Sequence, residues 1–166
     1  MKLDVSKAIR FPGQEFPFRV EQAIAPMEMG GDDIVFDTAV LEGVYSAMED
    51  GNITFDGQLT TVAHSVCANC LEPASADIQA AFRETFLRDG DPEDDENFCY
   101  SGSAVGFEKL AMSYAVLALP MRFLCQEDCP GLPGIAGTDE DYCQKEMQNE
   151  HPFAALQQLL TKDEEV

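Results

Sequence analysis

The chain of 166 residues has the length of one domain with a tail, and it is strongly acidic. It carries 10 lysines and arginines against 31 aspartates and glutamates, a formal net charge of −21, and 45% of its residues are hydrophobic. A buried core is therefore expected, and no apolar run approaches the roughly 20 residues that cross a bilayer. The first residues contain no apolar stretch of the signal-peptide type, so we expect a cytoplasmic protein. Its negative charge would repel a phosphate backbone and attract a basic protein. The alternative is that the charge serves solubility alone.

The first part of the chain predicts extended structure. The first 20 or so residues include FPGQEFPFRV, which is too rich in proline for a helix and indicates an edge strand or an extended arm. Gly30 to Asp33 favours a turn. Ile34 to Ala47 is rich in β-branched and aromatic residues and predicts a strand, which a hairpin turn at Asp50-Gly51 would follow.

Two further strands are expected next. The first runs from Ile53 to Val66 and is predicted to bulge at Asp56-Gly57. The second has a period of two, which indicates one buried and one exposed face. Its predicted buried residues are Ile78, Ala80, Phe82 and Phe86, and its predicted exposed residues are Asp77, Gln79, Arg83 and Thr85. The connection CANCLEP (67–73) joins these strands and carries a pair of cysteines.

The pattern becomes helical in the next part of the chain. Residues 88–96 form an acidic loop too charged to pack. Residues 105–119 then predict an amphipathic helix, with Ser103 as its N-cap and Pro120 at its end. The apolar stripe of this helix is expected to contain Phe107, Leu110, Ala111, Tyr114, and Leu117 or Ala118.

These elements indicate an α+β protein: an antiparallel β meander or partly open barrel with one main amphipathic helix and a short C-terminal helix. We expect residues 1–130 to form a single α+β domain. Residues 131–166 would be a loop-rich tail with a short terminal helix that packs back on the domain. The apolar stripe of this last helix comprises Phe153, Leu156, Leu159 and Leu160.

Two cysteine pairs are the strongest chemical signal. Cys67 and Cys70 have the C-x-x-C spacing that brings two thiolates to one tetrahedral zinc ion. Cys125 and Cys129 form a looser pair that would complete a four-cysteine zinc site if the fold brings the turns together. Cys143 and His151 offer another completion, and ordinary reduced cysteines are the alternative to any metal. Cys99 has no partner in the sequence and is interpreted as structural.

The sequence gives little reason to expect catalysis. A thioredoxin-like use of Cys67 and Cys70 requires the first cysteine at a helix N-terminus, whereas this pair lies in a strand-to-strand turn. His64 is interpreted as a surface or packing residue, and His151 as an entry to the last helix. No Ser-His-Asp set, phosphate-binding loop or dinucleotide glycine fingerprint is present. We therefore predict a binding protein, with no small-molecule substrate and no membrane partner.

The order of the segments resembles a known family. A strand region ending in CANCLEP (67–73) precedes an acidic loop and a helix ending in LALP (117–120), and then come CQEDCPGL (125–132) and HPFAAL (151–156). This ordered set resembles the YceD-like large ribosomal RNA subunit accumulation family of bacteria and plastids. The resemblance implies a non-enzymatic role in accumulation of large-subunit ribosomal RNA and hence in ribosome biogenesis.

The sequence also departs from this family. Many relatives carry a further C-x-x-C-Gly after the Gly-Leu pair and a C-x-C in the tail. The matching positions here are Pro133, Ala136 and Gly137, with Cys143 kept and Lys145 in place of the last cysteine. A structural zinc normally takes four ligands. We therefore expect no separate metal site in the tail, and any zinc would use Cys67 and Cys70 with help from elsewhere.

Three hypotheses remain open from the sequence. The first is a ribosome-biogenesis factor that binds a large-subunit ribosomal RNA precursor or a basic large-subunit ribosomal protein. The second is a zinc-bound structural or adaptor module unrelated to ribosomes, and the third is a thiol oxidoreductase that uses Cys67 and Cys70. Direct RNA binding would require the sparse cations to cluster. These include Arg10, Arg19, Arg83, Arg88, Lys109 and Arg122.

Overall fold

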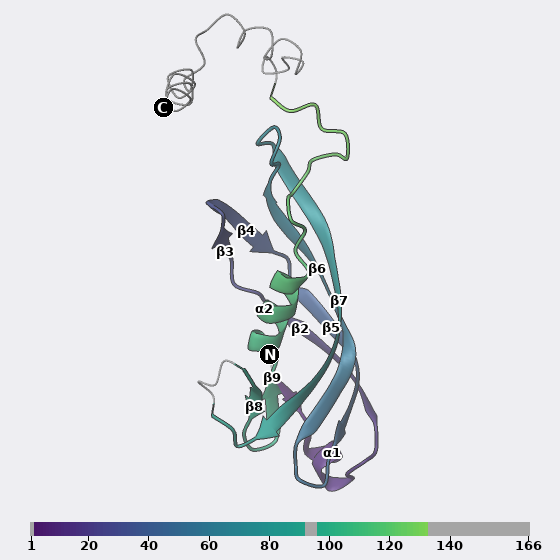
Figure 1. Cartoon of the computed structure of the whole chain (residues 1–166). Helices are drawn as coiled ribbons and strands as arrows, with labels where there is room; N and C mark the ends of the chain where they lie inside the picture. The colour runs from purple at the N-terminus through teal and green to yellow at the C-terminus, as the bar shows by residue number, and fades with distance from the viewer. Residues whose placement is uncertain (1, 92–95, 133–166) are drawn as a thin grey trace, which may run out of the picture.

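The structure is a computed structural model that describes residues 2–91 and 96–132. It consists mostly of antiparallel strands with two helices (Figure 1). The elements in chain order are β1 (Lys2–Asp4), α1 (Ser6–Arg10), β2 (Phe16–Gln22), β3 (Met27–Met29), β4 (Asp32–Phe36), β5 (Ala39–Ala47), β6 (Ile53–Val66), β7 (Pro73–Arg88), β8 (Phe98–Tyr100), β9 (Ala104–Gly106) and α2 (Glu108–Leu117).

The long strand β6 organises the larger sheet of the described residues. One edge of β6 pairs along its whole length with β7, from Ile53 opposite Phe86 to Val66 opposite Pro73. Its other edge pairs first with β5 and then, further along, with β4. Strands β2 and β3 extend that side of the sheet, β8 adds in parallel to the end of β7, and β1 and β9 form a separate pair. The β6–β7 hairpin therefore reaches beyond its neighbours to the end of the sheet that carries the cysteines (Figure 1).

The core lies on one face of this sheet, under α2. The phenylalanine Phe55 is fully buried, and its ring centroid lies 5.1 Å from those of Phe86 and Phe107. Phe18 contributes from β2 and stacks on Phe107 at 5.7 Å. Aromatic pairs at such distances add to the free energy gained by burying their surface. The helix presents Leu110, Ala111 and Ala115 to this cluster.

The predicted strands are largely confirmed, with two corrections. The expected strand 34–47 is divided into β4 and β5, because residues 37–39 lie opposite only two residues of β6 and so form a bulge. The bulge predicted at Asp56-Gly57 is wrong, since β6 passes through it without a break. Gly57 instead lies opposite Gly43, where an added Cβ would lie 2.4 Å from the carbonyl oxygen of Glu42. Close approach of the two backbones explains this glycine.

The α2 helix is shorter than predicted. The expected helix began at Val105, but Val105 pairs with Leu3 in the small sheet, which leaves Phe107 as the N-cap. Ser103 does not cap the helix and instead accepts the backbone N–H of Val5 at 2.9 Å. On the apolar stripe, Leu117 is 80% exposed, so Ala118 is the residue that packs against the core.

The α+β class is confirmed by this arrangement. The sheet of the described residues stays open, so neither the meander nor the partly open barrel is confirmed. In the first 20 residues, β2 is the predicted edge strand, whereas the short helix α1 was not predicted. The short C-terminal helix lies outside the described residues. The division into a domain of residues 1–130 and a tail of residues 131–166 stays a prediction.

Candidate metal centre

The turn between β6 and β7 positions the first two thiols. Odd-numbered residues of β6 face the core, and Cys67 continues this alternation and is fully buried. The turn is closed by hydrogen bonds from the Cys67 N–H to the carbonyl of Glu72 at 2.7 Å and from the Leu71 N–H back to the carbonyl of Cys67 at 2.9 Å. Leu71 takes a positive φ of 62°, which turns the chain back and leaves Cys70 half-buried beside Cys67.

The segment after α2 brings the second two thiols. It has no regular secondary structure, and it is fixed to the β6–β7 turn by the Ala68 N–H, which donates to the carbonyl of Phe123 at 2.9 Å. The Phe123 side chain is buried and anchors this segment in the core. Cys125 and Cys129 follow, and the side-chain amide of Asn69 approaches the carbonyl oxygen of Cys129 at 3.5 Å.

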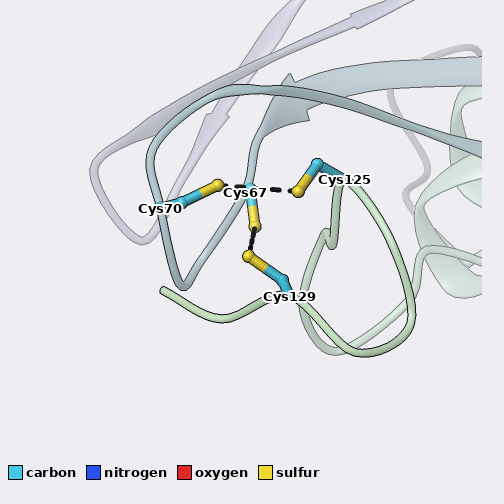
Figure 2. Close-up of side chains that lie close together, drawn as sticks. All are labelled: Cys67, Cys70, Cys125 and Cys129. Carbon is cyan, nitrogen blue, oxygen red and sulfur yellow. Dashed lines mark hydrogen bonds between the residues drawn. The ribbon is translucent and has the colours of Figure 1, made fainter. Parts of the chain in front are cut away.

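The four sulfur atoms converge on one point (Figure 2). All of them lie within 4.8 Å of one another, with 3.7 Å between the sulfurs of Cys67 and Cys129 and 3.5 Å between those of Cys70 and Cys125. A tetrahedral zinc ion with Zn–S bonds of about 2.3 Å places its sulfurs about 3.8 Å apart. The thiols therefore fit a tetrahedral zinc ion, or another soft metal that prefers four thiolates.

The thiols have divergent acidities. The backbone N–H of Cys125 donates to the Cys67 sulfur and, with the N–H groups of Asn69 and Cys70, lowers the pKa of Cys67 to about 6 despite its burial. The hydrogen bond with Cys70 and the nearby thiols raise the pKa of Cys125 to about 12. The Glu72 N–H alone would lower the pKa of Cys70, but desolvation and the neighbouring thiols outweigh it and raise that pKa.

These pKa shifts and the closeness of the four thiols indicate that the cluster suits a divalent metal ion. One buried thiolate is already stabilised by backbone N–H donors, the arrangement that commonly supports metal-bound sulfur. Further thiolates within a few ångströms repel one another unless a dication offsets their charge. Four protein ligands would leave a zinc ion no open position for a substrate, as in structural rather than catalytic sites.

The other candidate residues lie apart from this cluster. Cys99 is half-buried in β8 and does not belong to the group of four. His64 is exposed on β6 with its Nε2 3.3 Å from Asp37 Oδ1. The alternative ligands Cys143 and His151 lie outside the described residues, as do the positions where relatives carry additional cysteines.

Sequence reasoning missed the residues that support the thiols. Asn69 and Phe123 join the two segments, and the backbone N–H of Cys125 stabilises the buried Cys67 sulfur. The cysteine spacing contains no signal for these contacts. Three of the four residues between Pro120 and Cys125 are apolar, so the sequence does not single out Phe123 as the anchor.

Comparisons with known proteins place the chain in a family. Residues 55–160 match the family described as large ribosomal RNA subunit accumulation protein YceD, a range that contains both cysteine pairs. Two proteins described as uncharacterized, one from Mycobacterium bovis and one from Mycobacterium tuberculosis, are each 26% identical over 139 residues, which cover 80% of this chain and 67% of theirs. No solved structure matches. No helix among the described residues is long and apolar enough to cross a membrane.

The family match spans more than half of the chain and includes most of β6, all of β7 and α2, and the thiol centre. This chain therefore belongs to the YceD family of large ribosomal RNA subunit accumulation proteins.

Proposed function

We propose that this protein promotes accumulation of large-subunit ribosomal RNA by binding, without catalysing a reaction, in the cytoplasm. The observation that carries the proposal is the YceD match over residues 55–160. The cluster of Cys67, Cys70, Cys125 and Cys129 supports it, because four thiols that fit a closed metal site point to a structural centre.

In this proposal the zinc ion has a mechanical role. Zinc held by the four cysteines would join the β6–β7 turn to the segment after α2, although Cys70 and Cys125 are 55 positions apart in the sequence. The two cysteine pairs come from these two different segments, so a metal bound to all four fixes one against the other. The chain's own residues, Phe123 and Ala68, define where the segments meet.

The arrangement of charge favours a basic protein over RNA as the direct partner. Arg19 pairs with Glu42, and the side chains of Arg83 and Arg88 lie 3.8 Å and 3.7 Å from Asp56 and Asp89. These cations are spread over β2 and β7, and each lies beside a carboxylate. Nucleic-acid affinity depends on clustered cations that displace counterions. A basic large-subunit ribosomal protein suits this surface better than a ribosomal RNA precursor does.

The test is affinity capture of the tagged full-length protein from native extract, followed by mass spectrometry and RNA sequencing. We expect enrichment of a basic large-subunit ribosomal protein, or of large-subunit precursor RNA, above an unrelated protein of similar negative charge. RNase treatment of the extract separates the two, because a direct protein contact survives it. A capture that equals the acidic control would contradict the ribosomal role and leave the zinc adaptor as the better explanation.

A further inference from the structure

The outer face of the sheet differs between its two halves. The core-facing residues Ile34, Ala63 and Ile78 are buried, so their strand neighbours point to the opposite face, which no described helix covers. In the half near α1, two of the carboxylates on this face, those of Glu42 and Asp56, lie beside Arg19 and Arg83. In the half near the β3–β4 hairpin, the carboxylates instead surround exposed or half-buried valines.

Carboxylates surround an apolar centre in that second half. Glu28 lies directly opposite Asp33 in the β3–β4 hairpin, and Asp77 lies opposite Val62 in the β6–β7 pair. The backbone N–H of Asp37 donates to the carbonyl of Val62, so carboxylates flank this valine on both sides. Together with Val35, these residues form a surface that we name the acidic outer face: Glu28, Asp33, Val35, Asp37, Val62 and Asp77.

The charges of the acidic outer face are not offset within the described chain. Within residues 2–91 and 96–132, no lysine or arginine side chain forms an ion pair with these carboxylates. Asp37 lies beside His64, which is charged only when it is protonated. Like charges directly opposite on two strands are destabilising, as for Glu28 and Asp33. Val35, which pairs with β6 between the carboxylates, is 51% exposed. A cationic partner would relieve the repulsion and cover the valine.

We propose that the acidic outer face docks a lysine- or arginine-rich segment of a protein partner. This deepens the proposed function, on which it rests, by locating the partner's contact. Residues 133–166 of the chain contain eight acidic residues against two lysines, so this segment lacks the charge that complements the face. An RNA would meet carboxylates rather than cations. Four neighbouring strands at about 4.8 Å spacing give a platform about 15 Å wide, enough for one extended or helical segment.

The experiment titrates the labelled full-length protein with a short synthetic peptide of alternating lysine and valine, monitored by NMR and calorimetry. We expect amide shifts centred on residues 28–37, 60–66 and 75–79. The triple variant Glu28→Gln, Asp33→Asn, Asp77→Asn should weaken binding about tenfold, the size expected for three exposed charge pairs. The matched variant Glu15→Gln, Glu49→Gln, Glu96→Gln removes the same charge from exposed positions away from the acidic outer face and should change affinity less than twofold.

Equal weakening by the two variants, or shifts spread over the whole surface, would overturn the proposal. So would a single-stranded RNA that shifts these residues when the peptide does not. Affinity capture with the same variants keeps the two claims separate. If the wild type and the acidic-face variant enrich large-subunit material equally, the docking face is wrong and the function stands. If the peptide binds as expected but nothing ribosomal is enriched, the function is wrong and the docking face stands.

Discussion

Removing the zinc ion proposed for the thiol centre should release the segment after α2 while the sheet stays folded. This segment, from Leu119 to Cys129, has no regular secondary structure, and its main anchor is Phe123, which is 8% exposed. Its other contacts include the half-buried Leu119 and Leu124 and the hydrogen bonds from Ala68 and Asn69. The core around β6 and β7 does not depend on these contacts.

The free-energy contributions indicate that the segment after α2 stays in place only with a bound metal. Burial of Phe123, with the partial burial of Leu119 and Leu124, contributes about 4 kcal/mol, and two hydrogen bonds add about 2 kcal/mol. Ordering a segment of this length costs on the order of 10 kcal/mol. A structural zinc site contributes an apparent stabilisation of about 10 kcal/mol or more at neutral pH. The segment should therefore be held by a few kcal/mol with zinc and released without it.

Hydrogen–deuterium exchange with mass spectrometry measures this directly. After treatment with a chelator, the amides of residues 119–132 and of the turn 67–72 should lose their protection. The amides of β6 and β7 away from the turn should keep theirs, because their hydrogen bonds lie in the sheet. Bound zinc, measured by mass spectrometry of the native protein, should fall from one ion to none.

A pair of cysteine variants provides the control. Cys129→Ser removes one ligand and should reproduce the exchange pattern of the chelated protein, whereas Cys99→Ser, which lies outside the cluster, should behave as the wild type. Retained protection in residues 119–132 after metal removal would show that packing alone holds the segment. A wild-type zinc content in the Cys129→Ser protein would show that the centre uses other ligands.

Three further outcomes are expected from the described contacts. Gly57→Ala should lower the free energy of unfolding by about 3 kcal/mol in urea denaturation, because the added Cβ would lie 2.4 Å from the backbone oxygen of Glu42 in β5. An unchanged urea midpoint would contradict the close approach of the β5 and β6 backbones. Tyr114→Phe should cost about 1–2 kcal/mol in the same assay, since it removes the 2.5 Å hydrogen bond to Glu84, and a neutral effect would count against that bond. Zinc release to a coloured chelator should rise as the pH falls, because protons compete with the metal for the thiolates. In the metal-free protein the pKa of Cys67 is lowered to about 6, so the stability that its thiolate contributes is present at higher pH and is lost as the pH falls toward about 6; a melting temperature of the metal-free protein that rises toward acid would contradict this sign.

The strands with clear periodicity could be predicted from sequence, and long-range pairing explains the errors. Alternation at Ile78, Phe82 and Phe86 placed β7 correctly, because a period of two defines a buried face without knowledge of the partner. The start of α2 was placed too early because Val105 belongs to a two-stranded sheet whose other strand is at Leu3. Helical periodicity cannot reveal a pairing with a residue so distant in sequence.

The cysteine cluster was predicted only as one of several combinations. The spacing of Cys67 and Cys70 indicated a metal-binding turn, but the distance in sequence to Cys125 left the second pair undecided. The structure brings these segments together through the length of the β6–β7 hairpin and the anchor Phe123. Both are consequences of tertiary packing. The acidic outer face depends on register in the same way, since Glu28 and Asp77 are far apart in sequence.

The proposed role in ribosomal RNA accumulation is tested by the level of mature large-subunit ribosomal RNA in cells that lack this protein. We predict that the level falls relative to small-subunit ribosomal RNA. The wild-type gene and the Cys99→Ser variant should restore it, whereas a Cys67→Ser, Cys129→Ser variant should restore it poorly despite equal expression. An unchanged ratio of the two ribosomal RNAs in the deficient cells would contradict the proposed function.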